Sequence, residues 1–240
     1  MTYTLRDNKR RARTARLVFI LLAAASAGLV VLTSMLPPNV SPDDSLPRST
    51  TLLYAGFSLL SFVYLGLLIG SYVALIRWLR RAYYNLHQLP GIYPEYSDGW
   101  AAGAWFMPFI NFWRPFTIMR EVWQDTQLAA VGQVAVPATA LGWWWASFIL
   151  KLIVGRITWV MSKTSDDNFS EQDLLATILD AGAQVLAALL TWYVIGRIAR
   201  FEAQLTIRQQ IDQLGQPAPT GEVPAALAAE QSNYGQPEGY

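Results

Sequence analysis

The chain has no cysteine and only one histidine among its 240 residues. Without cysteine it cannot form a disulfide, a thiolate metal site or a cysteine nucleophile. The absence of cysteine also leaves the redox compartment of the protein undetermined. The histidine, His87, lies in a stretch typical of an interfacial turn, and a single histidine is too little for an ordinary metal centre. The sequence also lacks a Walker loop, G-x-S-x-G, H-E-x-x-H and G-x-G-x-x-G. We therefore expect no catalytic residue, no metal, no cofactor and no enzymatic activity.

Charged residues are also scarce. They make up 15% of the chain, against about 25% in an ordinary soluble domain, while 53% of the residues are apolar. The apolar residues lie in long runs rather than at periodic core positions, which favours a bundle embedded in a bilayer. The net charge of +1 gives no reason to expect a nucleic-acid partner.

Four apolar runs are long enough to cross a hydrocarbon core, which takes about 20 residues. They cover about 17–36, 51–76, 138–161 and 174–196. The sequence thus predicts an all-α fold, an integral membrane four-helix bundle. The membrane domain spans 17–215, because the last helix is expected to continue to about residue 215. A basic cytoplasmic N-terminus (1–16) precedes it, and a disordered cytoplasmic tail (216–240), rich in Pro, Gly and Gln, follows.

The basic residues indicate the orientation of the bundle. Six precede the first run, five lie between the second and third runs, and three follow the fourth, whereas the two opposite loops hold only Arg48 and Lys163. Both termini are therefore expected on the cytoplasmic side of the inner (cell) membrane.

The segment 98–128, between the second and third runs, is aromatic and broken. Its centre reads WFMPFINFWRPFTIMREVW, and Pro108 and Pro115 each interrupt a helix. We expect an interfacial or re-entrant helix–break–helix, with half-helices over about 98–107 and from Pro115 onward. The second half places Phe116, Met119, Val122 and Trp123 on one face, which should lie against lipid or the bundle. The alternative is a cytoplasmic amphipathic helix packed on the bundle.

The stretches IRWLRRAYYNL and GWAAGAWFMPFINFWRPFTIMREVW resemble an uncharacterised bacterial membrane family, domain-of-unknown-function family 4328. The resemblance covers roughly 51–196 and implies a multi-pass membrane fold without an established activity. The positions that carry it are Trp78, Arg81, Asn85, Leu86, Trp105, Pro108, Asn111, Arg114, Pro115, Glu121 and Trp123.

The candidate binding residues lie on the cytoplasmic side, where anionic headgroups would be. Each basic residue near such a surface contributes about 1 kcal/mol of attraction. Alternatively, these arginines only enforce the topology. The candidates for lipid or partner binding are Arg77, Arg80, Arg81, Trp105, Asn111, Arg114, Arg120 and Trp123.

Three charges lie within the last two runs, Lys151, Arg156 and Asp180, where ionisable groups are expensive and often functional. Counted along the helices, Arg156 and Asp180 lie at similar depths, so we expect them to pair. Lys151 lies deeper, too far inward to reach Asp180 easily, and is expected to face the bundle interior, a water-filled cavity or the broken segment. The alternative is that Arg156 extends outward to the interface.

These features suggest a non-enzymatic scaffold or regulator that binds the lipid bilayer, anionic lipids included, or a membrane protein partner, or forms a homo-oligomer. A small channel or transporter that uses the broken segment and the intramembrane charges is the alternative, and a lipid-modifying enzyme comes third.

Overall fold

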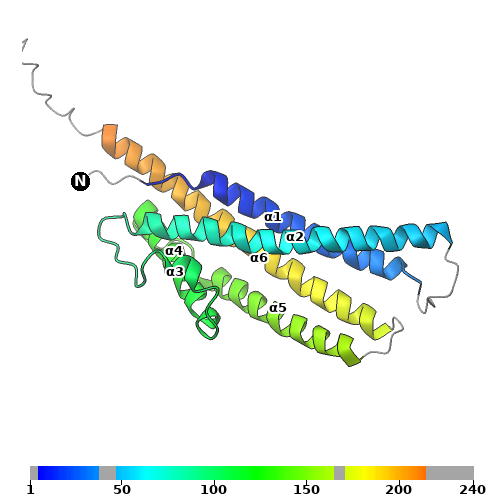
Figure 1. Ribbon diagram of the computed structural model, residues 1–240. Coiled ribbons are helices and arrows are strands. Elements are labelled where there is room, and N and C mark those ends of the chain that lie inside the picture. The colour runs from blue at the N-terminus through cyan, green and yellow to red at the C-terminus, as the bar shows by residue number, and fades with distance from the viewer. Residues whose placement is uncertain (1–4, 38–46, 165–170, 215–240) are drawn as a thin grey trace, which may run out of the picture.

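The computed structural model describes residues 5–37, 47–164 and 171–214, and every element in these ranges is a helix (Figure 1). The predicted disordered tail, 216–240, lies outside the described residues. The long helices are α1 Lys9–Met35, α2 Arg48–Leu86, α5 Thr139–Thr164 and α6 Glu171–Leu214. The short elements are α3 Trp100–Gly103, the 3-10 helix η1 Ile110–Phe112, and α4 Arg114–Val131.

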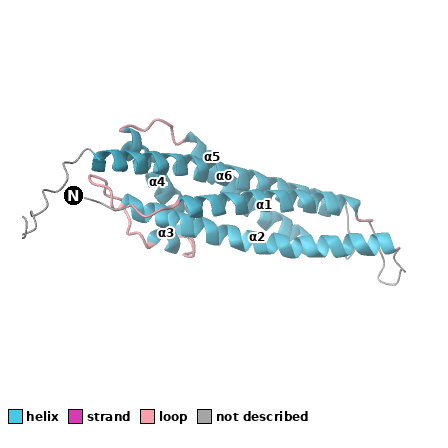
Figure 2. Cartoon of the chain, turned by 90° about the horizontal axis from the view of Figure 1, so that it is seen from above, coloured by secondary structure: helices cyan, strands magenta, loops and turns pink. Residues whose placement is uncertain are grey.

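The four long helices run alongside one another as a bundle (Figures 1 and 2). Helices α1 and α6 pack against each other, α2 packs against α1, and α5 packs against α6. Helix α4 packs against α6 and α2 at one end, which we call the broad end of the bundle. The broad end also contains α3, the start of α1 and the ends of α2 and α6 (Figure 1). The predicted helical bundle is confirmed.

All four long helices are long and apolar enough to cross a membrane. Helix α2 has 39 residues and α6 has 44. At about 1.5 Å per residue each is roughly twice as long as a hydrocarbon core is thick. Along α2 many of the large apolar side chains are exposed as far as Val73 and others are half-buried, whereas Trp78, Leu79 and Tyr83 are buried. The helix thus passes from a surface suited to lipid into a protein core at the broad end.

Two predicted helix boundaries are wrong at this end. Helix α1 begins at Lys9 rather than near Leu17, so half of the predicted basic N-terminus is helical. Helix α2 continues ten residues past Ile76. Both extensions carry arginines, which stop an apolar run without stopping a helix, because arginine is a good helix former.

Arg16 shows why the extension of α1 is part of the bundle. Its guanidinium lies over the Trp192 ring, 4.4 Å from the ring centroid. It also lies against Gly196, where an added Cβ would be 3.2 Å from Arg16 Cζ. The missing side chain of Gly196 therefore lets an arginine of α1 lie across α6.

The aromatic segment is broken as predicted, but its first half is shorter. Only one helical turn, α3, forms where a half-helix over 98–107 was expected. A residue before proline avoids the helical region, which favours an early end before Pro108. The second half is confirmed: α4 starts at Arg114 with proline in its first turn. It ends at Gly132, whose φ of 78° suits a left-handed cap.

Candidate functional site

A groove between α1 and α2 carries basic residues at the broad end. Its volume is about 560 Å³. Arg10, Arg11 and Arg77 line one part of it, and the Arg11 guanidinium donates a hydrogen bond to the Arg77 carbonyl oxygen over 3.1 Å. The remaining lining is small or apolar apart from one threonine: Thr14, Val18, Gly70, Val73 and Ala74. We call this the basic groove.

The arginines around the basic groove have no acidic side chain within 4.0 Å in the part of the chain that the structure describes. Arg11 is repelled by Arg77, Arg80 and Arg81. Among the described residues, the only side-chain pair of opposite charge within 4.0 Å is elsewhere, between α5 and α6. The first turn of α1 also lacks an acidic residue and begins with Lys9, Arg10 and Arg11. Cations are unfavourable at a helix N-terminus by about 0.3–1 kcal/mol. The Asp7 carboxylate, which accepts the Lys9 backbone N–H over 3.0 Å, offsets part of this charge.

The predicted binding residues do not form one surface. Arg77, Arg80 and Arg120 are exposed and Arg81 is half-buried, whereas Trp105 and Trp123 are buried in the core of the broad end. Trp105 packs edge-on against Phe148 of α5, and the Trp123 indole N–H donates to the Val136 carbonyl oxygen over 3.1 Å. These tryptophans hold the broad end together.

Arg114 also serves the local structure. The Arg114 guanidinium lies over the rings of Trp100 and Tyr96, at 4.1 and 4.5 Å from their centroids. These contacts fix the start of α4 against the loop that precedes α3. Asn111 lies in η1, where its side-chain oxygen is buried without a hydrogen-bond partner.

The apolar face of α4 lies against the bundle rather than against lipid. Met119 and Val122 are fully buried, and Phe116 packs against the Trp145 ring of α5. The exposed apolar surface lies instead in the break before α4. Its members, which we call the aromatic loop, are Phe106, Met107, Phe109, Phe112 and Trp113. The expectation that this face lies against lipid or the bundle is therefore confirmed for the bundle, whereas the exposed side chains of the aromatic loop were not selected from the sequence.

Phe109 at the tip of the aromatic loop has φ +68°. A large side chain rarely adopts this left-handed backbone, so the loop holds its tip in a strained conformation. Its side chain is 75% exposed. Strain that exposes an aromatic ring instead of burying it points to contact outside the chain.

The intramembrane charges pair differently from the prediction. Lys151 Nζ lies 2.5 Å from Asp180 Oδ1, joining α5 to α6. Arg156 is exposed and lies over the Trp159 ring of its own helix, 4.3 Å from the centroid. The expected Arg156–Asp180 pair is therefore wrong, and so is the expectation that Lys151 lies too deep to reach Asp180.

Helix geometry explains this correction. Residues 151 and 156 point about 140° apart on a helix, so only one of them can face α6. Gly155 marks the facing side, because a Cβ added there would lie 3.4 Å from Asp180 Oδ1 and 4.0 Å from Lys151 Nζ. The stem of Lys151 extends along this bare turn to the carboxylate. Asp180 also lines a cavity of about 400 Å³ with Ser26 and Tyr64.

Two polar links at the broad end were missed from the sequence. Tyr83 donates a 2.6 Å hydrogen bond to Glu121, joining α2 to α4. The His87 ring lies between the carbonyl oxygens of Tyr83 and Tyr96, at 2.8 and 2.9 Å, so it links α2 to the next loop. No local sequence pattern predicts either link, because each link joins residues of different elements.

Burial and neighbouring charges raise the pKa of Glu121. Burial is the largest cause that raises its pKa above the ordinary value, and the charges of Glu95 and Asp125 add to it. The Tyr83 hydrogen bond opposes the rise. The pKa of Asp125 is raised by burial as well.

Comparison with known proteins identifies a family for this chain but no curated relative. No curated protein and no solved structure is detectably similar to the chain. Residues 42–203 match the family described as "Domain of unknown function (DUF4328)". The match includes α2 to α5 and most of α6, and thus the broad end apart from α1 and the extreme end of α6. This multi-pass membrane protein therefore belongs to the DUF4328 family.

Proposed function

We propose that this protein is a non-enzymatic membrane scaffold or regulator whose broad end faces the cytoplasm and binds anionic phospholipid. The basic groove between α1 and α2 carries the proposal. Arg10, Arg11 and Arg77 line its basic part, and no carboxylate of the described residues lies within 4.0 Å of them. An anionic headgroup would supply the missing charge.

The groove suits a phospholipid in both of its parts. Guanidinium groups bind phosphate oxygens through paired, charge-assisted hydrogen bonds. Val18, Gly70 and Val73 continue the groove along the helices with apolar surface. The groove has free space at Gly70, where an added Cβ would meet only Val18, at 4.0 Å. A headgroup at the arginines would thus have its acyl chain on the apolar part.

The aromatic loop supports the same placement from another side of the molecule. Aromatic side chains favour the headgroup level of a bilayer, where the ring is buried and polar groups stay hydrated. Trp105, just before the loop, packs on α5, so the loop lies beside a membrane-spanning helix. Two sides of the broad end thus carry surface suited to the interface.

Native mass spectrometry of the full chain tests the proposal, with phosphatidylglycerol and phosphatidylcholine supplied together in detergent. We expect the wild type to retain phosphatidylglycerol preferentially. The double variant Arg11→Gln, Arg77→Gln should lower that preference about tenfold or more, since each arginine contributes about 1 kcal/mol. Gly70→Leu, which fills the groove, should reduce retention without changing the charge.

Arg13→Gln with Arg200→Gln is the matched control. Both arginines are exposed and neither lines the groove, so the net charge changes equally without touching the site. An equal loss of phosphatidylglycerol in the control would contradict a defined site. Full retention by the Arg11, Arg77 variant would contradict the proposal outright.

A channel or transporter is the second candidate, and the Lys151–Asp180 pair favours it. The pair lies between two cavities: Lys151 lines one with Gln184 and Ser71, and Asp180 lines the other. Intramembrane charges of this kind often mark an ion or substrate path. Ion flux into proteoliposomes that disappears in Asp180→Asn would support this candidate, and no flux in the wild type would count against it.

A further inference from the structure

The residues that precede α1 form a strap across the broad end. In this strap, Leu5–Asn8, the backbone N–H of Arg6 donates to Asn85 Oδ1 over 3.0 Å. The Asn85 side-chain amide donates back to the Arg6 carbonyl oxygen over 2.9 Å. This reciprocal pair fixes the strap to the end of α2. The strap therefore has one defined position.

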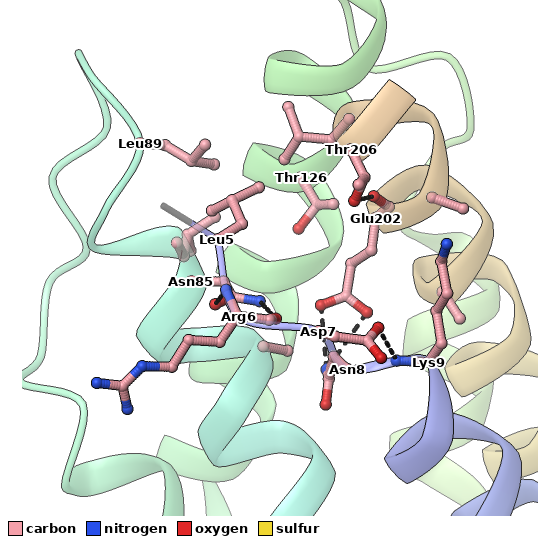
Figure 3. Close-up of a pocket in the computed structure, with 15 residues that line it drawn as sticks. Leu5, Arg6, Asp7, Asn8, Lys9, Asn85, Leu89, Thr126, Glu202 and Thr206 are labelled. Atoms are coloured by element: carbon pink, nitrogen blue, oxygen red, sulfur yellow. Dashed lines mark hydrogen bonds between the residues drawn. The ribbon is translucent and has the colours of Figure 1, made fainter. Parts of the chain in front are cut away.

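The strap closes one wall of a cavity of about 240 Å³. The other walls come from α2, α4 and α6 (Figure 3). Much of the lining is apolar, including Leu5, Leu86, Leu89 and Leu205. Arg6 lines the cavity but directs its guanidinium away from it, over the Tyr84 ring at 4.1 Å. The interior of the cavity is therefore short of positive charge.

Glu202 of α6 brings a carboxylate to this cavity. Its two oxygens accept from the Asn8 side-chain amide, over 3.1 and 3.3 Å. No cationic side chain among the described residues lies within 4.0 Å of it. Lys9, at the cavity edge, directs its ammonium elsewhere in Figure 3. A half-buried carboxylate is thus left without a matching charge.

Thr126 of α4 supplies an independent observation. It is 5% exposed and lines the same cavity. The hydroxyls of Thr117, Thr191 and Thr206 each donate to the carbonyl oxygen four residues earlier. The Thr126 hydroxyl has no hydrogen-bond partner in the described part of the chain. Figure 3 shows it directed toward the side of the cavity that holds the Glu202 carboxylate.

We propose that this cavity binds a small primary ammonium ion between Glu202 and Thr126. An ammonium group carries three N–H donors, which the carboxylate and the free hydroxyl can accept. Its short alkyl group would lie on the leucine side chains. A divalent metal fits poorly, because Ca²⁺ or Mg²⁺ takes six or more oxygen ligands, and no group of three acidic or histidine side chains occurs among the described residues. This site is separate from the basic groove.

Thermal unfolding of the full chain in detergent tests the proposal, with ethylammonium chloride exchanged for sodium chloride at constant total salt. A ligand that binds only the folded state raises the unfolding midpoint in a saturable way. Tetramethylammonium, which has the charge but no N–H donor, should not do so. We expect Glu202→Gln to weaken the apparent affinity about tenfold or more, and Thr126→Val to weaken it about threefold to tenfold.

Glu95→Gln is the matched control, because Glu95 is an exposed carboxylate that does not line the cavity and should leave the affinity unchanged. Two results would overturn the proposal. One is an equal midpoint rise in the wild type and Glu202→Gln. The other is no difference between ethylammonium and tetramethylammonium in the wild type. If Glu202→Gln does not fold, an unchanged affinity in Thr126→Val would overturn it. Lipid retention by the basic groove is a separate readout and does not depend on this outcome.

Discussion

Gly155 determines which cation of α5 reaches Asp180. Its missing side chain leaves a bare turn between Lys151 and the carboxylate, and the lysine stem occupies that turn. The pair is only partly accessible, with side-chain exposures of 20% and 30%. Separating two such charges leaves each without its partner in a region of low polarity.

Asp180→Asn should therefore destabilise the protein, by about 1–3 kcal/mol, which is less than the loss of a fully buried pair because both side chains are partly exposed. Arg156→Gln is the control and should change the unfolding free energy by about 0.5 kcal/mol or less. Chemical unfolding in detergent measures both. Equal destabilisation by the two variants would contradict the pairing. Reversing the charges at 156 and 180 should give no rescue.

Glu121 should make stability depend on pH. Its raised pKa means that the folded state binds the proton more tightly than the unfolded state. The free energy of unfolding should therefore fall as the pH rises from the ordinary glutamate pKa through the higher folded pKa, and stay low above it. Glu121→Gln removes this part of the pH dependence.

Tyr83→Phe should have the opposite effect on the slope of the unfolding free energy against pH. Without the Tyr83 donor the pKa of Glu121 rises further, so the dependence of stability on pH becomes steeper. Unfolding curves of the three proteins at several pH values test both changes. The same slope in wild type and Glu121→Gln would show that Glu121 does not contribute.

At the scale of elements, the aromatic loop and α4 have opposite environments. Met119 of α4 is buried in the broad end, whereas Phe109 of the loop is 75% exposed. We expect a fluorophore on Phe109→Cys to be quenched by lipid-borne quenchers. The same label on Tyr93→Cys, in the loop that extends away from the spans, should be quenched by aqueous iodide (Figure 1).

The aromatic loop must also be dispensable for folding if its role is contact with lipid. Phe109→Ser should change the unfolding free energy little, whereas Met119→Ala should cost about 2–5 kcal/mol. Quenching of the residue-109 label by iodide alone would place the loop in water and contradict this assignment.

The sequence predicts elements better than it predicts their ends. Long apolar runs identify the four spans because lipid requires continuous apolar surface. The end of α2 was missed because Trp78, Leu79 and Tyr83 are interleaved with arginines, which interrupt a run although the apolar positions keep helical spacing. The break before α4 was recognised because proline acts locally.

The sites could be predicted only in part, for a physical reason. Of the arginines of the basic groove, Arg77 was a candidate from its place beside the spans, whereas Arg10 and Arg11 were counted only as part of the basic N-terminus. The Glu202 cavity was not, because Asn8 and Glu202 are 194 residues apart and meet only when α1 packs on α6. The prediction of an Arg156–Asp180 pair failed because depth was counted along each helix, while the direction of each side chain around the helix decides the partner.

At the scale of the whole molecule, the account depends on orientation. The start of α1, the end of α2, α4 and the end of α6 gather at the broad end, together with most of the basic residues (Figure 1). Positive charge stays on the cytoplasmic side of a membrane. The basic groove would then face the anionic leaflet, and the ammonium cavity would open to the cytoplasm.

Labelling of single cysteines with a membrane-impermeant maleimide in intact cells tests this orientation most directly. The chain has no cysteine of its own, so the background is clean. Thr51→Cys, exposed near the start of α2, should react in intact cells. Tyr93→Cys, which is 91% exposed at the broad end, should react only after the membrane is permeabilised. Reaction of residue 93 in intact cells, with residue 51 protected until permeabilisation, would contradict the account.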